Sequence, residues 1–194
     1  VRSSESACAI TDAGLYCWGG NRAGDVGVGG DPYVAQSVPA RVALEGVTDV
    51  AAKVDHVCAV SNGAVYCWGG NTHGEVSPGG AAAVSTPARV ALPAVAREVT
   101  VGDAFACART DGGVYCWGDN TRGQVADARY VTSHEPSRVP LAGEVVTVAA
   151  GSAHTCALVR TGEVYCWGYN RVGELGDPRC DARCLERIRA GDIA

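Results

Sequence analysis

One string of residues, Tyr-Cys-Trp-Gly, occurs four times and divides the chain into repeats. The copies lie at residues 16–19, 66–69, 115–118 and 165–168. A second cysteine precedes each copy, at Cys8, Cys58, Cys107 and Cys156, and successive copies are 49 or 50 residues apart. A repeat of this length is one supersecondary unit that cannot bury its apolar faces alone, so neighbouring units are expected to stack.

Each repeat contains four short stretches with the residue content of β-strands. In the second unit these stretches lie at about 38–43, 47–52, 56–60 and 64–69. The 26 glycines favour short strands joined by tight turns. The sequence therefore predicts an all-β fold, a β-propeller of four-stranded antiparallel blades. A solenoid of stacked sheets is the alternative.

A weaker repeated string sets the expected unit boundaries within a single propeller domain spanning 1–194. It reads Pro-Ala-Arg-Val at 39–42 and 87–90, Pro-Ser-Arg-Val at 136–139 and Leu-Glu-Arg-Ile at 185–188. The expected units are 1–36, 37–85, 86–134 and 135–184, with 185–194 completing the blade begun by 1–36. Residues 191–194 read on into 1–3 resemble the segment 46–54, so the two ends would pair and close a ring. The same resemblance fits a piece of a longer array.

Hairpin arithmetic predicts that the repeated cysteines form disulfides within each unit. Pairing Cys58 with Cys67 centres a turn on Asn62-Gly63, and pairing Cys107 with Cys116 centres one on Asp111-Gly112. Both dipeptides are preferred in two-residue type I′ hairpins. Counting outward from these turns places the cysteines at non-hydrogen-bonded positions, where Cα atoms are about 4.5 Å apart and within disulfide reach.

The other two units need different turns to keep the same pairing. For Cys8 with Cys17 we expect a four-residue turn from Thr11 to Gly14, because Ala13 is unfavourable at positive φ. For Cys156 with Cys166 we expect a three-residue loop with Gly162 in the left-handed region.

Four disulfides indicate an oxidising setting, which is extracellular, periplasmic or at the cell surface. Cys180 and Cys184 lie outside the repeat, and we expect them to form a local disulfide; a reactive or partner-linking pair is the alternative. Zinc binding is disfavoured because the spacing across a hairpin lacks the short knuckle of zinc motifs.

Charge and motif content narrow the functional classes. A net charge of −5 with a single lysine, Lys53, argues against nucleic acid as a partner. No run of about 18 apolar residues predicts a membrane span. The common hydrolase, metalloprotease, Walker and dinucleotide motifs are absent from the sequence. We therefore expect no catalytic residue, metal or cofactor.

Two longer segments carry a family resemblance. The sequences CAVSNGAVYCWGGNTHGEV at 58–76 and HTCALVRTGEVYCWGYNRVGELG at 154–176 resemble repeats of the regulator of chromosome condensation family, in particular its bacterial, cysteine-containing branch. The resemblance covers essentially the whole chain. It implies a propeller of four-stranded blades, usually seven, that serves as a platform for protein interactions. The family's Gly-Gln-Leu-Gly is altered at 24–27, 74–77 and 123–126, which puts the anchoring of those loops in doubt.

Several residue types recur once per unit, and each has a structural interpretation. We expect the four tryptophans to pack between blades, and His56 and His154 to make structural hydrogen bonds. A rim of acidic residues, which could hold a cation, is the less favoured interpretation of Asp25, Glu75 and Glu174, and Gln124 completes that set. Arg41, Arg89, Arg138 and Arg187 are expected to face solvent.

The long connections after each Tyr-Cys-Trp-Gly differ between units and are expected to carry recognition. They span about 20–37, 70–86, 118–135 and 168–184, and their candidate partner-binding residues are Tyr33, His73, Tyr130, His134 and Tyr169. The leading hypothesis is a binding module for a protein or glycan. The alternatives are a structural segment that self-associates within a longer array, and an enzyme with a site at the propeller axis.

Overall fold

The computed structural model describes residues 1, 5–77, 80–127, 129–176 and 185–188, which form four antiparallel sheets. The first sheet contains β1 (Ser6–Thr11), β2 (Gly14–Gly19) and β3 (Gln36–Arg41). The second contains β4 (Val47–Lys53), β5 (His56–Ser61), β6 (Ala64–Gly70) and β7 (Ala83–Val90). The third contains β8 (Ala96–Val101), β9 (Phe105–Thr110), β10 (Gly113–Gly118) and β11 (Ser133–Arg138). The fourth contains β12 (Val145–Ala150), β13 (His154–Val159), β14 (Val164–Gly168) and β15 (Leu185–Ile188).

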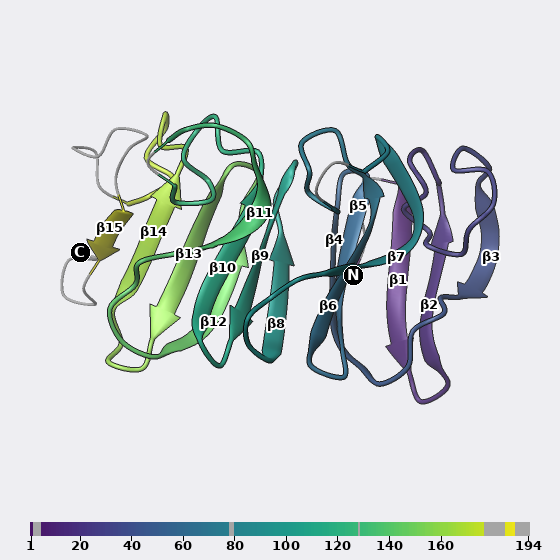
Figure 1. Cartoon of the computed structure of the whole chain (residues 1–194), viewed down its shortest axis with the longest axis horizontal. Coiled ribbons are helices and arrows are strands. Elements are labelled where there is room, and N and C mark those ends of the chain that lie inside the picture. The colour runs from purple at the N-terminus through teal and green to yellow at the C-terminus, as the bar shows by residue number, and fades with distance from the viewer. Residues whose placement is uncertain (2–4, 78–79, 128, 177–184, 189–194) are drawn as a thin grey trace.

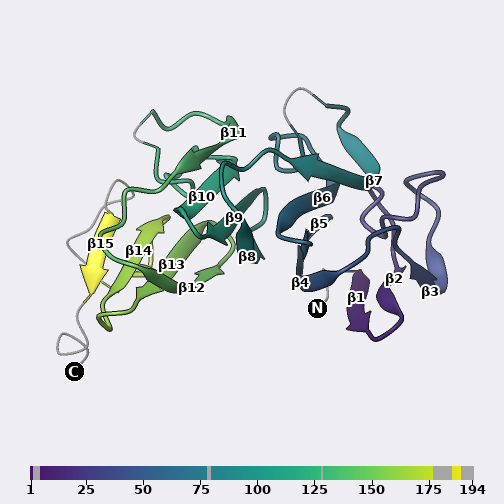
Figure 2. The same cartoon turned by 60° about the horizontal axis from the view of Figure 1, so that its bottom comes forward.

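The four sheets stand side by side, as the blades of a propeller do. In Figures 1 and 2 the first sheet lies at one end of the row and the fourth at the other. The apolar core lies between successive sheets: one cluster packs Val65 and Val76 of the second against Val99 and Trp117 of the third. The all-β propeller prediction is confirmed. No helix that is long and apolar enough to cross a membrane occurs among the described residues.

The sheets are out of phase with the expected repeat units. The segment near 38–43 was expected to open the second unit, but β3 pairs with β2 and closes the first sheet, with Tyr16 opposite Arg41. Likewise β15 pairs with β14 rather than completing the first blade. Each long connection therefore returns to its own sheet, and the short link after the outer strand crosses to the next one. A repeated string shows the length of the repeat. It does not show whether the strand that follows a long connection pairs with the preceding hairpin or with the next one.

Ring closure by the two chain ends involves residues 2–4 and 189–194, which lie outside the described residues. One part of that expectation is visible. The amino group of Val1 donates to the carbonyl of Cys8, and the Cys8 N–H donates back to Val1, at 2.8 and 2.9 Å. Val1 thus occupies the place that Ala51 takes opposite Cys58 in the second sheet.

The predicted disulfides are confirmed. They join Cys8 to Cys17, Cys58 to Cys67, Cys107 to Cys116 and Cys156 to Cys166. Each pair is directly opposite on neighbouring strands, with Cα atoms 4.1–4.2 Å apart. Cys180 and Cys184 lie outside the described residues.

The hairpin turns match the predicted positions, and one differs in type. Asn62 and Gly63 have φ of 49° and 76°, as a type I′ turn requires. At Asp111-Gly112 neither residue has positive φ; instead Gly113 does, with φ of 117°. The Thr110 hydroxyl accounts for the difference, because it accepts from the Gly112 N–H at 3.1 Å and donates to the Gly113 carbonyl at 2.9 Å. The Thr11–Gly14 turn of the first sheet has the same hydrogen bonds. In the fourth sheet, Gly162 has the predicted positive φ, at 88°.

Candidate functional site

The long connections that carry the candidate binding residues lie along one rim of the row of sheets. Each leaves the second strand of its hairpin at the end opposite the tight turn and returns to the outer strand. In Figure 1 they run along the upper edge, with the β1–β2 turn at the lower edge. The connections of successive sheets are therefore neighbours, and their exposed side chains share one surface.

An asparagine anchors each connection; it is buried in the first three connections and partly buried in the fourth, and its role was not predicted from the sequence. Its Oδ1 accepts the backbone N–H of the residue five positions later, at 2.9–3.2 Å, in the pairs Asn21–Val26, Asn71–Val76, Asn120–Val125 and Asn170–Leu175. In the first three connections its Nδ2 also donates to backbone carbonyls farther along. The signal was present in the sequence, because an Asn stands three residues after each repeated Trp. These bonds tie each long connection to its own start, so the connection is held in a defined shape.

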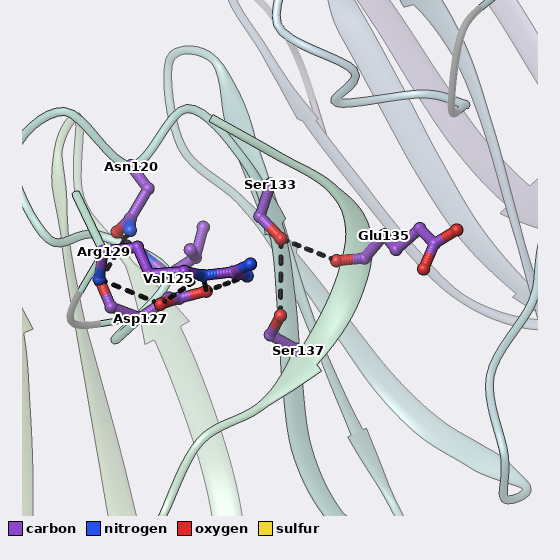
Figure 3. Close-up of polar contacts among 7 residues, drawn as sticks. All are labelled: Asn120, Val125, Asp127, Arg129, Ser133, Glu135 and Ser137. Carbon is purple, nitrogen blue, oxygen red and sulfur yellow. Dashed lines mark hydrogen bonds and ion pairs between the residues drawn. The ribbon is translucent and has the colours of Figure 1, made fainter. Parts of the chain in front are cut away.

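Figure 3 shows this anchoring in the connection between β10 and β11. The Asn120 amide donates to the Asp127 carbonyl at 2.8 Å, and the Asp127 side chain pairs with the guanidinium of Arg129. That ion pair lowers the pKa of the Asp127 carboxyl, chiefly through the side-chain hydrogen bond. Where the chain enters β11, the buried Ser133 hydroxyl donates to the Glu135 carbonyl at 2.9 Å and lies 3.3 Å from the Ser137 hydroxyl.

The recurrent acidic or amide side chains also make local bonds. Glu75 accepts the His73 N–H at 2.6 Å, and Gln124 accepts the Arg122 N–H at 2.9 Å. Glu174 accepts the Val172 N–H at 2.9 Å, and this backbone bond lowers the pKa of its carboxyl. These three side chains thus hold their own connections, as the local interpretation predicts. No group of three or more His, Cys, Asp or Glu residues able to hold a metal occurs within the described ranges.

The five candidate binding residues differ in exposure. Tyr33 is 74% exposed, and its backbone N–H is held by the Asp31 carboxylate at 2.9 Å. His73 and His134 are exposed, whereas Tyr130 and Tyr169 are partly buried.

The structure brings these residues together only in part. His134, at the start of β11, lies against Gly74 of the preceding connection, so closely that a Cβ atom at Gly74 would overlap its ring. His134 therefore lies beside the segment that carries His73. Tyr169 is covered by the guanidinium of Arg122, 4.5 Å from the ring centroid. Arg122 is a second residue whose role was not predicted from the sequence. Tyr33 belongs to the connection of the first sheet, two sheets away from the connection that carries Tyr130.

Three of the four recurrent tryptophans pack between blades as predicted. Trp68, Trp117 and Trp167 are at most 1% exposed. Trp18, on the first sheet, is only half-buried. These side chains belong to the packing of the sheets and not to the rim surface.

The prediction of a structural hydrogen bond is wrong for His56. The ring is fully buried, and neither ring nitrogen has a hydrogen-bond partner; the nearest Asp55 oxygen is 3.8 Å from Nδ1. Phe105 fills the equivalent position in the third sheet and Ser6 the one in the first, so the position does not require a hydrogen-bonding ring. Solvent exposure is confirmed for Arg41, Arg89 and Arg138, while the side chain of Arg187 lies outside what is described.

Two hollows lie at the opposite rim, beside the hairpin turns. One, of about 330 Å³, is formed by the Asn62–Val65 turn and the link from Arg89 to Val95. The other, of about 390 Å³, lies between the Arg109–Gly113 turn and Gly143–Val145. Neither includes a candidate binding residue.

The repeat seen in the sheets corresponds to a known family. Sequence models of the regulator of chromosome condensation (RCC1) repeat match residues 12–60 and 111–158 in one form, and 47–75, 96–124 and 145–174 in another. The chain belongs to the RCC1 repeat family. The RCC1 repeat accounts for the recurrent cysteines, tryptophans and asparagines as parts of one unit. No curated protein sequence matches the chain significantly.

Solved structures share the fold. Human WBSCR16 superposes with a TM-score of 0.82 at 25% identity, over 93% of this chain and 49% of its own. Yeast RCC1 (Prp20), in a crystal structure with Kap60 bound, gives a TM-score of 0.81 at 22% identity, over 96% of this chain and 47% of its own. The ectodomain of the Physcomitrella patens receptor kinase CR4 gives 0.56 at 23% identity, over 87% and 40%. The chain thus spans 40–49% of the length of these structures.

Proposed function

We propose that this chain is a protein-binding module that recognises its partner through the rim formed by the long connections. The observation that carries the proposal is the presence of exposed side chains on connections that buried asparagines hold in shape. Tyr33 and Val34 are 74% and 62% exposed, and Val131 is 54% exposed. Exposed aromatic and apolar groups on a rigid support lose little conformational entropy when they bind, which favours specific recognition.

A protein partner is favoured over a glycan by the family. RCC1-repeat propellers commonly mediate protein interactions, and Prp20 is seen with Kap60 bound. We also propose that the chain does not act as an enzyme, because the recurrent side chains of Glu75, Gln124 and Glu174 are engaged in local bonds to the backbone. The net charge of −5 supports a partner other than nucleic acid.

We propose that the module works in an oxidising compartment, outside the cell, in the periplasm or at the cell surface. The support is the four disulfides, one in every sheet. The fold is similar to that of the ectodomain of the receptor kinase CR4, which is compatible with an extracellular setting.

The test is a binding comparison that uses the oxidised chain and two rim variants. Secreted and surface proteins of the source organism are captured on the wild-type chain, and each captured protein is then titrated against the variants. Tyr33→Ala and His134→Ala are expected to weaken binding roughly 10-fold, which is about 1.4 kcal/mol. Val95→Ala is the control, since Val95 is 46% exposed at the opposite rim. If both rim variants bind every captured protein as tightly as the wild type and Val95→Ala do, the rim is not the recognition surface.

A further inference from the structure

Each boundary between successive sheets uses the same directed hydrogen bond. The indole N–H of the later sheet donates to a backbone carbonyl in the preceding connection. The three pairs are Trp68 to Asp25 at 3.0 Å, Trp117 to Glu75 at 2.8 Å and Trp167 to Gln124 at 2.9 Å. A sheet therefore has two unlike faces, one that presents the indole and one that presents the accepting connection.

A close contact between a glycine and the outer strand of the next sheet accompanies this bond at the first two boundaries. A Cβ atom at Gly24 would lie 2.6 Å from the Cα of Ser85, in the outer strand of the next sheet. At Gly74 an added Cβ atom would overlap the ring of His134, the residue that corresponds to Ser85, and would lie 3.2 Å from its Cα. At the first boundary the Gly29 N–H also donates to the Ser85 carbonyl at 2.8 Å. The accepting face therefore has two defining features. One is the backbone carbonyl that accepts the indole N–H, and the other is the glycine against which the outer strand of the next sheet packs.

The first and last sheets each keep one of these faces unused within the described part of the chain. On the first sheet Trp18 is half-buried, and no indole hydrogen bond is formed there among the described residues. On the last sheet Glu174 occupies the position of the accepting residue, and a Cβ atom added at Gly173 would meet no described heavy atom within 4 Å. Ser37, exposed on β3, corresponds to Ser85. The unused faces are the two complementary halves of the internal boundary.

We propose that a second copy of this chain docks end to end, with the Trp18 face of one copy against the Glu174 face of the other. The Trp18 indole donates to the Glu174 carbonyl, and Gly173 packs on Ser37. The occupant is a second copy because the chain itself carries both halves of an interface that it already forms three times. Two copies joined at both ends contain eight sheets, which is within the range of about four to eight blades in closed propellers.

The first test is the mass of the oxidised 194-residue chain by sedimentation and light scattering. We expect a species of twice the 19.8 kDa chain mass. Trp18→Ala is expected to weaken self-association roughly 30-fold, as loss of a central tryptophan does at other interfaces. Unchanged circular dichroism and four intact hairpin disulfides show that the variant is folded. A chain that stays monomeric at every concentration overturns the proposal.

A second variant blocks the other face without touching the first. Gly173→Trp places a bulky side chain where the partner's Ser37 packs. Gly162→Trp is the matched control, because φ is 89° at Gly173 and 88° at Gly162, and both positions are open. The strain of a side chain at positive φ is therefore alike in the two variants. We expect Gly173→Trp to be monomeric and Gly162→Trp to associate as the wild type does.

Mixing the two defective variants decides whether the contact is end to end. The Trp18→Ala variant keeps an unaltered Glu174 face, and the Gly173→Trp variant keeps an unaltered Trp18 face. The mixture is therefore expected to form a heterodimer through one intact contact. A dimer that joins the same patch of both copies gives no such rescue. Self-association that persists unchanged in both single variants, or a mixture with no heterodimer, contradicts the proposed contact.

Discussion

The indole nitrogen of Trp117 lies 2.8 Å from the carbonyl oxygen of Glu75, so the third sheet is bonded directly to the connection of the second. The Glu75 side chain in turn accepts the backbone N–H of His73 at 2.6 Å. The buried packing between sheets is therefore coupled to the shape of the exposed rim. A change in a core tryptophan is expected to alter the rim as well as stability.

Replacing Trp117 by Phe tests this bond. The variant keeps an aromatic ring but leaves the buried Glu75 carbonyl without its donor, which costs about 1–3 kcal/mol. The cost is measured as the loss of free energy of unfolding in urea. Trp18→Phe is the matched control, because the Trp18 indole donates to no described acceptor, and we expect a change below about 0.5 kcal/mol in the monomer. Equal losses in the two variants contradict the role of the bond.

Removing an anchoring asparagine is expected to loosen one connection. The Asn71 Oδ1 accepts from Val76 and Ser77, and its Nδ2 donates to Ser77 and Ala81. Asn71→Ala leaves the buried Val76 N–H and the less buried Ser77 and Ala81 groups without these partners, and we expect a loss of about 1–3 kcal/mol. Faster amide hydrogen exchange at Val76 and Ser77 provides the local readout. Thr72→Ala, an exposed neighbour, controls for a general effect, and unchanged exchange in Asn71→Ala argues against anchoring.

The fold and the disulfides were predictable from the sequence because local geometry determines them. Cys58 and Cys67 face each other whenever Asn62-Gly63 forms the turn, and the structure has this register. The position of Trp117 beside a paired cysteine likewise predicted its burial between sheets.

The pairing of the outer strands and the contacts of the long connections were not predictable, because they depend on residues that are distant in sequence. Nothing local to Arg41 shows that its strand pairs with β2 instead of opening the next sheet, so the repeat alone did not predict this pairing. The bonds of Asn120 reach backbone groups five and seven residues ahead in an irregular segment. The stacking of Arg122 on Tyr169 joins two connections 47 residues apart, and no pattern in either connection indicates it.

Each hairpin disulfide is expected to stabilise the chain by a similar amount. The Cys58–Cys67 bond links residues separated by nine positions, for which the chain-entropy estimate is about 2–3 kcal/mol. The double variant Cys58→Ala and Cys67→Ala removes the bond without leaving a free thiol. Its free energy of unfolding is compared with that of the oxidised wild type, and with both proteins under reducing conditions as the control. The double variant is expected to be less stable than the wild type mainly in oxidising buffer. If its deficit in the free energy of unfolding is no greater there than in reducing buffer, the bond does not stabilise the chain.

The ion pair between Asp127 and Arg129 predicts a pH dependence with a definite sign. Arg129 lowers the pKa of the Asp127 carboxyl in the folded chain, so the pair stabilises above the ordinary Asp pKa of about 3.9 and this contribution is lost as the pH falls through the lowered value. Arg129→Ala is expected to raise the Asp127 pKa toward its ordinary value, as measured by NMR titration of the carboxyl carbon. Arg171→Ala, in the next connection, is the control. Because Arg129 is largely exposed, salt is expected to reduce the difference between wild type and Arg129→Ala. An Asp127 pKa that is the same in wild type and Arg129→Ala contradicts the pairing.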